Sequence, residues 1–274
     1  MLQRFTRAAP ERFADDSGTW LLVQEHSVTD RIADLMIARV DEDALQVRLA
    51  AWTRPLGLTE VRALRHLRSD RGATADWIAS KMRVTIDHAR ALLRRLEREE
   101  MVERTMSGSY AKRISLRPAL RTVVTFELKR EGWRRALVQA RAHQSFADRC
   151  YVVFDAASKA FAANRDSYRQ VGIGLLAFCA ATQAIHQTAP SRASKFRDAT
   201  LALFNSERVL ARMLGQPVTR LPQASLPGAA GEIADPEPPT LIGNGISLQG
   251  IAAGRGCRGD RWRTRPGACA PRTR

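Results

Sequence analysis

The alternation of apolar and polar residues predicts a pair of strands near the start of the chain. Residues 20–40, WLLVQEHSVTDRIADLMIARV, contain two β-favouring runs around a polar turn at residues 27–31. From Ile32 to Ile37 successive residues alternate with a period of two, as expected for a strand with two different faces. We therefore expect two neighbouring strands joined by a short turn.

Over residues 58–116 most apolar residues recur at helical spacing instead of alternating. Three segments, LTEVRALRHLRS, ATADWIASKM and IDHARALLRRLEREE, repeat apolar residues every three or four positions, which is typical of amphipathic helices. In the second segment we expect Trp77, Ile78 and Met82 to face inward. The following MVERTMSGSYAKRISL alternates on both sides of Gly108, which predicts a β-hairpin with glycine in its turn.

The segment after Arg121 returns to strand patterning. TVVTFELK, EGWRRALVQARAHQSF and CYVVFDAA predict a strand, a helix and a strand in succession, and this order favours parallel strands joined by a crossover helix. GIGLLAFCAA predicts a further strand, and a helix is expected over residues 194–214. The fold class predicted is α/β (α+β), with a central mixed sheet flanked by helices.

The charge of the chain points to a polyanionic partner. Lys and Arg number 44 against 28 Asp and Glu, for a formal net charge of +16. Nucleic acid is the first candidate partner and an anionic membrane surface the second. The sequence contains no apolar run of the roughly 18 residues that a membrane span requires, so we expect no membrane partner. The four cysteines lack CxxC spacing, which fits reduced thiols in a cytoplasmic protein.

The three helices and the hairpin, in that order, resemble the winged helix-turn-helix family. The resemblance covers about 60 residues and implies that the third helix enters the major groove of DNA while the hairpin contacts the backbone. The residues it marks for DNA contact are Arg83, Thr85, Arg90, Arg94, Arg98, Lys112 and Arg113. Two alternatives stay open: these arginines form a solvated helix face, or the module binds another protein.

Acidic and basic residues at the ends of the predicted strands suggest metal-dependent chemistry. Glu127 and Lys129 are two positions apart on one strand, so their side chains share a face. If the strand that carries Asp34 pairs with this strand, two carboxylates and a lysine meet. Mg²⁺ accepts one or two carboxylates and keeps several waters, and such an ion activates water for attack on phosphate.

This arrangement resembles the PD-(D/E)XK nuclease superfamily. The matching stretches are RIADLMI for the first acidic strand and FELK for the second, followed by a helix and the strand FADRCYVVFD. The resemblance implies a restriction-endonuclease-like sheet and a bound Mg²⁺ or Mn²⁺, with Asp34 and Glu127 as metal ligands. It implies that Lys129 positions the attacking water, and it adds Glu25 and Gln139 to the site.

The sequence departs from this superfamily in the spacing of its acidic strands. Asp34 and Glu127 are separated by 92 residues, where a short gap is usual. Insertion of the helical module between neighbouring strands would explain the gap, because loop closure cost grows slowly with length. The predicted boundaries are 1–54 and 119–216 for the two parts of a nuclease-like domain, 55–118 for the inserted module, and 217–274 for a basic tail.

The tail after residue 217 is expected to be disordered. It is rich in Pro, Gly, Ala and Arg without helical or strand periodicity, and such a segment buries too little apolar surface to offset the loss of chain entropy. Its arginines could contact nucleic acid or simply be solvated.

The sequence leaves the biochemical role between a metal-dependent DNA nuclease and a non-catalytic transcriptional regulator with a degenerate nuclease-like scaffold. A homodimer is compatible with both. In the simplest alternative, Asp34 pairs with Arg31 or Arg121, and Lys129 pairs with Glu131.

Overall fold

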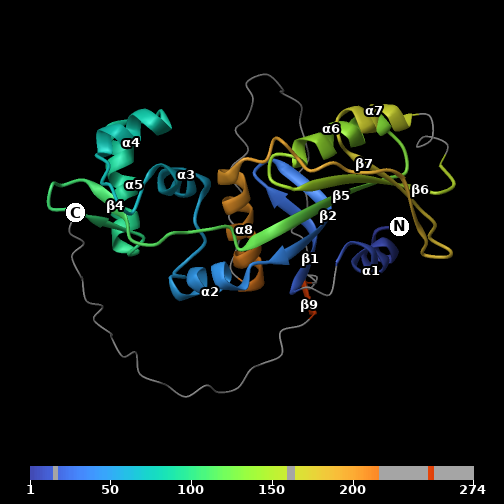
Figure 1. Cartoon of the computed structure of the whole chain (residues 1–274), viewed down its shortest axis with the longest axis horizontal. Coiled ribbons are helices and arrows are strands. Elements are labelled where there is room, and N and C mark those ends of the chain that lie inside the picture. The colour runs from blue at the N-terminus through green and yellow to red at the C-terminus, as the bar shows by residue number, and fades with distance from the viewer. Residues whose placement is uncertain (15–17, 159–163, 216–245, 250–274) are drawn as a thin grey trace, which may run out of the picture.

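One mixed β-sheet with helices on both faces forms the body of the protein. The computed structural model describes residues 1–14, 18–158, 164–215 and 246–249. A group of three helices and a two-stranded hairpin lies beside the sheet, as Figure 1 shows. The α/β class expected from the sequence is confirmed. None of the described helices is long and apolar enough to cross a membrane.

The sheet has the strand order β8-β7-β6-β5-β2-β1-β9. The strands β1, β2 and β5 are antiparallel neighbours, whereas β5, β6 and β7 run parallel and β8 is antiparallel to β7. Both the expected strand pair and the parallel crossover are therefore confirmed. The strand bounds are β1 Trp20–Val28, β2 Arg31–Val40, β5 Leu120–Lys129, β6 Arg149–Asp155, β7 Gly174–Phe178, β8 Ile185–Ala189 and β9 Ile246–Gln249.

Different helices cover the two faces of the sheet, because successive residues of a strand point to opposite sides. On β5, Val123 belongs to the apolar cluster beneath α6 and α8, whereas Val124 and Phe126 belong to the cluster beneath α1. Figure 1 shows α1 on the opposite side of the sheet from α6 and α7. These helices are α1 Leu2–Phe13, α6 Trp133–His143, α7 Arg165–Gln170 and α8 Ala199–Met213.

The chain between β2 and β5 forms the separate helical group. It contains the three expected helices and the expected hairpin, preceded by a helix that we did not predict. Gly108 turns the hairpin with a φ of 77°, a conformation that favours glycine. The bounds are α2 Glu42–Ala50, α3 Leu58–His66, α4 Ala75–Met82, α5 Ile86–Arg98, β3 Val102–Arg104 and β4 Tyr110–Lys112.

Trp77 departs from the inward orientation predicted for it. Its side chain is 43% exposed, because Ile78 and Ala79 take the buried positions of α4. The Trp77 ring instead meets the His66 ring edge-on, with centroids 6.1 Å apart, and the Lys81 ammonium lies 5.6 Å from its centroid. The apolar repeat located the helix correctly but assigned one residue too many to its buried face.

A buried ion pair joins the helical group to the body. Glu207 of α8 is 1% exposed and accepts two hydrogen bonds from Arg48 of α2, at 2.6 and 2.8 Å. The same carboxylate accepts the backbone N–H of Leu56 at 2.9 Å. Arg54, in the segment between α2 and α3, pairs with Glu60 of α3 and with Glu99 just after α5. Charged side chains therefore fix the inserted segment to α8.

The strand β9 differs from the disorder expected for the whole tail. Its four residues, ISLQ, pair antiparallel with β1 from Trp20 to Val23. This pairing satisfies backbone groups that β1 would otherwise expose as an edge strand. The other residues of the 217–274 segment lie outside the part of the chain that the structure describes.

Candidate functional site

The two acidic strands lie side by side, although the helical group separates them in sequence. The antiparallel register pairs Leu35 of β2 with Phe126 of β5, and its continuation places Asp34 opposite Glu127. The Asp34 carboxylate accepts the backbone N–H of Leu128 at 2.7 Å. This hydrogen bond holds Asp34 against β5, beside Glu127.

Glu127 and Lys129 form an ion pair on the α6 side of β5. Lys129 Nζ lies 2.7 Å from Glu127 Oε1. Glu127 is 1% exposed and Lys129 is 26% exposed, so the lysine lies between the carboxylate and solvent. The simpler pairings considered for these residues are not those observed. Lys129 pairs with Glu127 rather than Glu131. Arg31 pairs with Asp30, and Arg121 with Asp41, rather than with Asp34.

The surroundings of Glu127 disfavour its charged form. Burial raises the pKa of Glu127, and the negative charge of Asp34 raises it further, whereas Lys129 and Arg135 oppose the shift. Two neighbouring carboxylates repel each other when both are ionised, so each one disfavours the charged form of the other. An added cation would relieve this repulsion.

The free oxygen of Glu127 suits a hard cation. Glu127 Oε2 is buried and has no hydrogen-bond partner among the described residues, and such an unsatisfied buried oxygen is costly. The side chains nearby supply the two carboxylates that suffice for Mg²⁺ together with waters. No cluster of three or more Asp, Glu, His or Cys suited to a metal occurs in the described part of the chain.

Glu25 lies in the same row of residues but has a different environment. The pairs Gln24–Leu35 and His26–Ala33 flank it, so the register places Glu25 opposite Asp34. Its φ of 48° is left-handed, and its side chain is exposed. Three acidic positions thus align across β1, β2 and β5, with only Glu127 deeply buried.

Two further polar side chains of α6 remain partly unsatisfied on the same face of the sheet. The buried Oε1 atom of Gln139 has no hydrogen-bond partner among the described residues, and neither has Nδ1 of His143. His143 Nε2 donates to the Ile32 carbonyl at 3.2 Å, and this leaves Nδ1 as an acceptor. Burial lowers the pKa of His143 to about 4, so the ring is neutral near pH 7.

His143 is not among the site residues expected from the sequence, and no second histidine stands at metal-ligand spacing from it. One signal was present: Ala136, Ala140 and His143 recur at intervals of four and three. All three are buried, which makes His143 part of the helix face that packs on the sheet.

The arginines of α5 form an exposed basic face. Arg90, Arg94 and Arg98 are spaced by four residues and all are exposed, so they share one side of the helix. The buried side of α5 carries Ala89, Leu92, Leu93 and Leu96. Arg90 also lies 3.7 Å from the Asp87 carboxylate.

The other residues marked for DNA contact lie around α5. Arg83 ends α4 in a left-handed conformation with a φ of 57°, and Thr85 caps α5 by accepting the His88 N–H. In the hairpin region Lys112 is half-buried, and burial lowers its pKa. Arg113 pairs with Glu100 at 3.3 Å. Arg83 and Arg113 are exposed like the α5 arginines, whereas Lys112 is only partly exposed.

Comparison with known proteins identifies no relative of this chain. No family model matches it, and neither a curated protein nor a solved structure does.

Proposed function

We propose that this protein is a metal-dependent DNA nuclease of the PD-(D/E)XK type, with an inserted winged helix-turn-helix module that holds duplex DNA. The observation that carries the proposal is the pairing of β2 with β5 across the insertion, which places Asp34 opposite Glu127. A mixed sheet flanked by helices is the scaffold that the resemblance implies. The role of the inserted segment follows from its helix order and its basic third helix.

The polar groups of this chain suit hydrolysis of a phosphodiester. The reaction adds water at phosphorus and breaks one phosphorus–oxygen bond, and the departing oxygen receives a proton. Lys129 is held by Glu127 Oε1, and its remaining N–H groups can orient a water and offset negative charge that develops on the phosphate. The Leu128 N–H donates to the Asp34 carboxylate and fixes it, so this carboxylate is preorganised beside Glu127.

A Mg²⁺ or Mn²⁺ ion fits this donor set at Asp34 and Glu127, because the free Glu127 Oε2 and the neighbouring Asp34 provide hard oxygen ligands. Such an ion lowers the pKa of a bound water and polarises a phosphoryl oxygen. Gln139 Oε1 and the neutral His143 add acceptors on the same face of the sheet.

The direct test is cleavage of DNA by the full chain in the presence and absence of metal. Supercoiled plasmid, linear duplex and single-stranded DNA are incubated with Mg²⁺ or Mn²⁺, and the products are separated on gels. We expect nicked or cut products that disappear when a chelator is added. Binding without cutting of every DNA form, with either metal present, would contradict the enzymatic proposal.

The winged-helix proposal predicts that the α5 arginines supply affinity for duplex DNA. We expect Arg94→Ala and Arg98→Ala each to weaken binding by about tenfold at low salt. Each variant should also lower the slope of log K against log salt by about 1, because one phosphate is no longer neutralised. Fluorescence anisotropy with a labelled duplex at several salt concentrations measures both quantities.

Arg62→Ala is the matched control for these variants. Arg62 is an exposed arginine of α3 in the same helical group, and its removal changes the net charge equally. If the α5 variants bind duplex no more weakly than Arg62→Ala, general charge explains the affinity, and α5 does not read DNA.

A second candidate function is a non-catalytic DNA-binding regulator. The observation that favours it is the burial of Glu127 at 1% exposure behind its ion pair with Lys129, since such a pair can be purely structural. This alternative expects a defined operator in footprinting experiments and unchanged DNA affinity in Glu127→Gln.

A further inference from the structure

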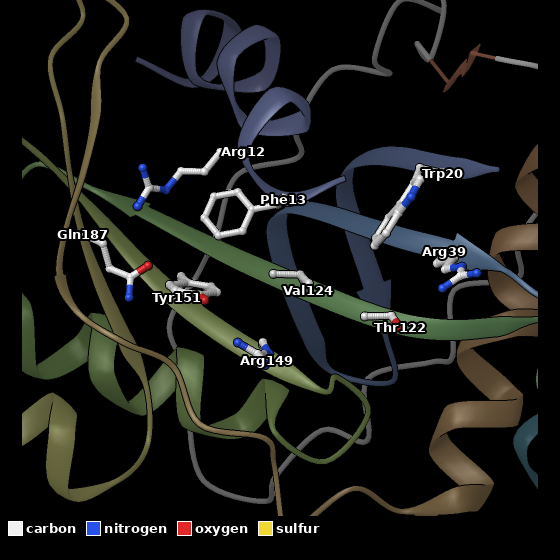
Figure 2. Close-up of a pocket in the computed structure, with 9 residues that line it drawn as sticks. All are labelled: Arg12, Phe13, Trp20, Arg39, Thr122, Val124, Arg149, Tyr151 and Gln187. Carbon is white, nitrogen blue, oxygen red and sulfur yellow. The ribbon is translucent and has the colours of Figure 1, made fainter. Parts of the chain in front are cut away.

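A hollow of about 490 Å³ opens on the α1 side of the sheet, away from the acidic strands. Figure 2 shows its floor on β5 and β6, with α1 above it and β8 at one side. It forms near the starts of β5 and β6, whereas Glu127 and Lys129 lie at the end of β5. The lining residues are Arg12, Phe13, Trp20, Arg39, Thr122, Val124, Arg149, Tyr151 and Gln187.

The charged lining residues are all basic. Three of the nine are arginines, from α1, β2 and β6, and none of the nine is acidic. Arg12 donates one hydrogen bond to the Ile185 carbonyl at 3.1 Å, which positions its guanidinium at the rim. Arg12 and Arg149 are both exposed. Guanidinium groups bind phosphate oxygens through paired hydrogen bonds, so the hollow suits a phosphorylated ligand.

The same hollow presents aromatic surface. Tyr151 is fixed beneath it, with its ring stacked on Phe126 at a centroid distance of 5.6 Å. Phe13 packs against Tyr151 at 5.1 Å, while Phe13 and Trp20 stay partly exposed. In Figure 2 their rings lie on either side of Val124. Aromatic faces of this kind stack with nucleobases regardless of base identity.

We infer that this hollow is a nucleotide-binding site that takes a base against Trp20 or Phe13 and a phosphate against Arg12 and Arg149. Its volume lies within the range of about 300–1,000 Å³ that is usual for small-ligand sites. An apolar ligand would leave the basic character of the lining unused, and a bare anion would leave the aromatic surface unused. The nucleotide can be free in solution or part of a single strand.

This inference goes beyond DNA cleavage and does not rest on it. Val124, in the floor of the hollow, belongs to the α1 side of β5. Glu127 pairs with Lys129, and the positive charge of Arg135 in α6 lowers the pKa of Glu127. The helix α6 covers the other face of the sheet. A ligand in the hollow is therefore separated from Asp34, Glu127 and Lys129 by the sheet itself.

The test compares arginines inside and outside the hollow. Calorimetry with AMP measures binding to the full chain and to Arg12→Gln, Arg149→Gln and Arg7→Gln. Arg7 is an exposed residue of α1 that does not line the hollow, so it controls for net charge. We expect about tenfold weaker AMP binding in the first two variants, because each loses a charge-assisted hydrogen bond, and no change in Arg7→Gln.

Two further measurements identify the ligand. Trp20→Leu is expected to weaken AMP binding more than binding of ribose 5-phosphate, which lacks a base. Displacement of AMP by a short oligo-dT would identify a single strand as the source of the nucleotide, and failure to displace it would identify a free nucleotide; either result keeps the site. Glu127→Gln is expected to bind AMP normally, whether or not the wild-type protein cuts DNA.

Two results would overturn the inference. The first is that the protein does not bind AMP and that any binding of oligo-dT is unchanged in Arg12→Gln and Arg149→Gln. The other is equal affinity in Arg12→Gln, Arg149→Gln and Arg7→Gln, since the attraction would then be the general charge of the protein.

Discussion

Glu127→Gln is expected to reduce metal-dependent DNA cleavage by at least about 100-fold, the scale of loss when one preorganised electrostatic group is removed from an active site. The amide keeps the shape of the side chain but removes the negative charge that would hold the cation beside Asp34. The fold should tolerate the change, because the pKa of Glu127 is raised and its buried environment already disfavours the charge. Initial rates on plasmid DNA, together with Tm, measure the two effects separately.

The control for this experiment is Glu131→Gln. Glu131 is exposed and follows β5 by two residues, so the same chemical change occurs outside the candidate site. Lys129→Met is a second variant, which removes the ammonium that Glu127 holds at 2.7 Å. Cleavage by Glu127→Gln at the wild-type rate would remove Asp34 and Glu127 from the reaction.

Glu207→Ala is expected to destabilise the protein by about 3–5 kcal/mol, the usual cost of leaving one member of a buried ion pair uncompensated. Arg48 is 2% exposed and would lose both of its hydrogen bonds to the Glu207 carboxylate. The Leu56 N–H would lose its acceptor as well. For a chain of this size we expect Tm to fall by at least about 6 °C, as measured by calorimetry.

Glu100→Gln serves as the comparison for this stability effect. Glu100 and Arg113 also form an ion pair, at 3.3 Å, but both side chains are more than half exposed. Surface pairs contribute about 0–1 kcal/mol, so Tm should barely change. If Glu207→Ala is as mild as this control, the carbonyls of Ala51 and Arg54, to which Arg48 also donates, suffice to hold Arg48.

Local patterning predicted most elements, and the exceptions have physical explanations. The strand pair of β1 and β2 and the helices α3, α4 and α5 follow from periods of two and of about 3.6 residues. The helix α1 was not predicted, although Phe5 and Ala9 are fully buried against the sheet. Its Pro10 and many arginines obscure the helical pattern, and only packing against Phe126 and Phe178 explains its position.

Candidate site residues could be predicted only where their residue types suggest chemistry and the period of a strand places them on one face. Glu127 and Lys129 share a face because they are two apart on one strand, and their ion pair follows from that spacing. Arg48 and Glu207, separated by 158 residues, carry no sequence signal of their contact. The nine residues around the hollow come from six different elements, α1, β1, β2, β5, β6 and β8, so no local motif could have indicated them.

The sequence by itself determined the two acidic strands, the basic helix between them and the charge that favours a polyanionic partner. The strands and the helix depend on neighbouring residues, because the backbone period converts a local pattern into local structure. The net charge depends on composition alone. Only the tertiary structure decided that β2 pairs with β5 across 79 intervening residues and that arginines and aromatic rings converge beneath α1. Such contacts depend on how apolar faces pack together, because burial is non-directional and many pairings satisfy the same local pattern.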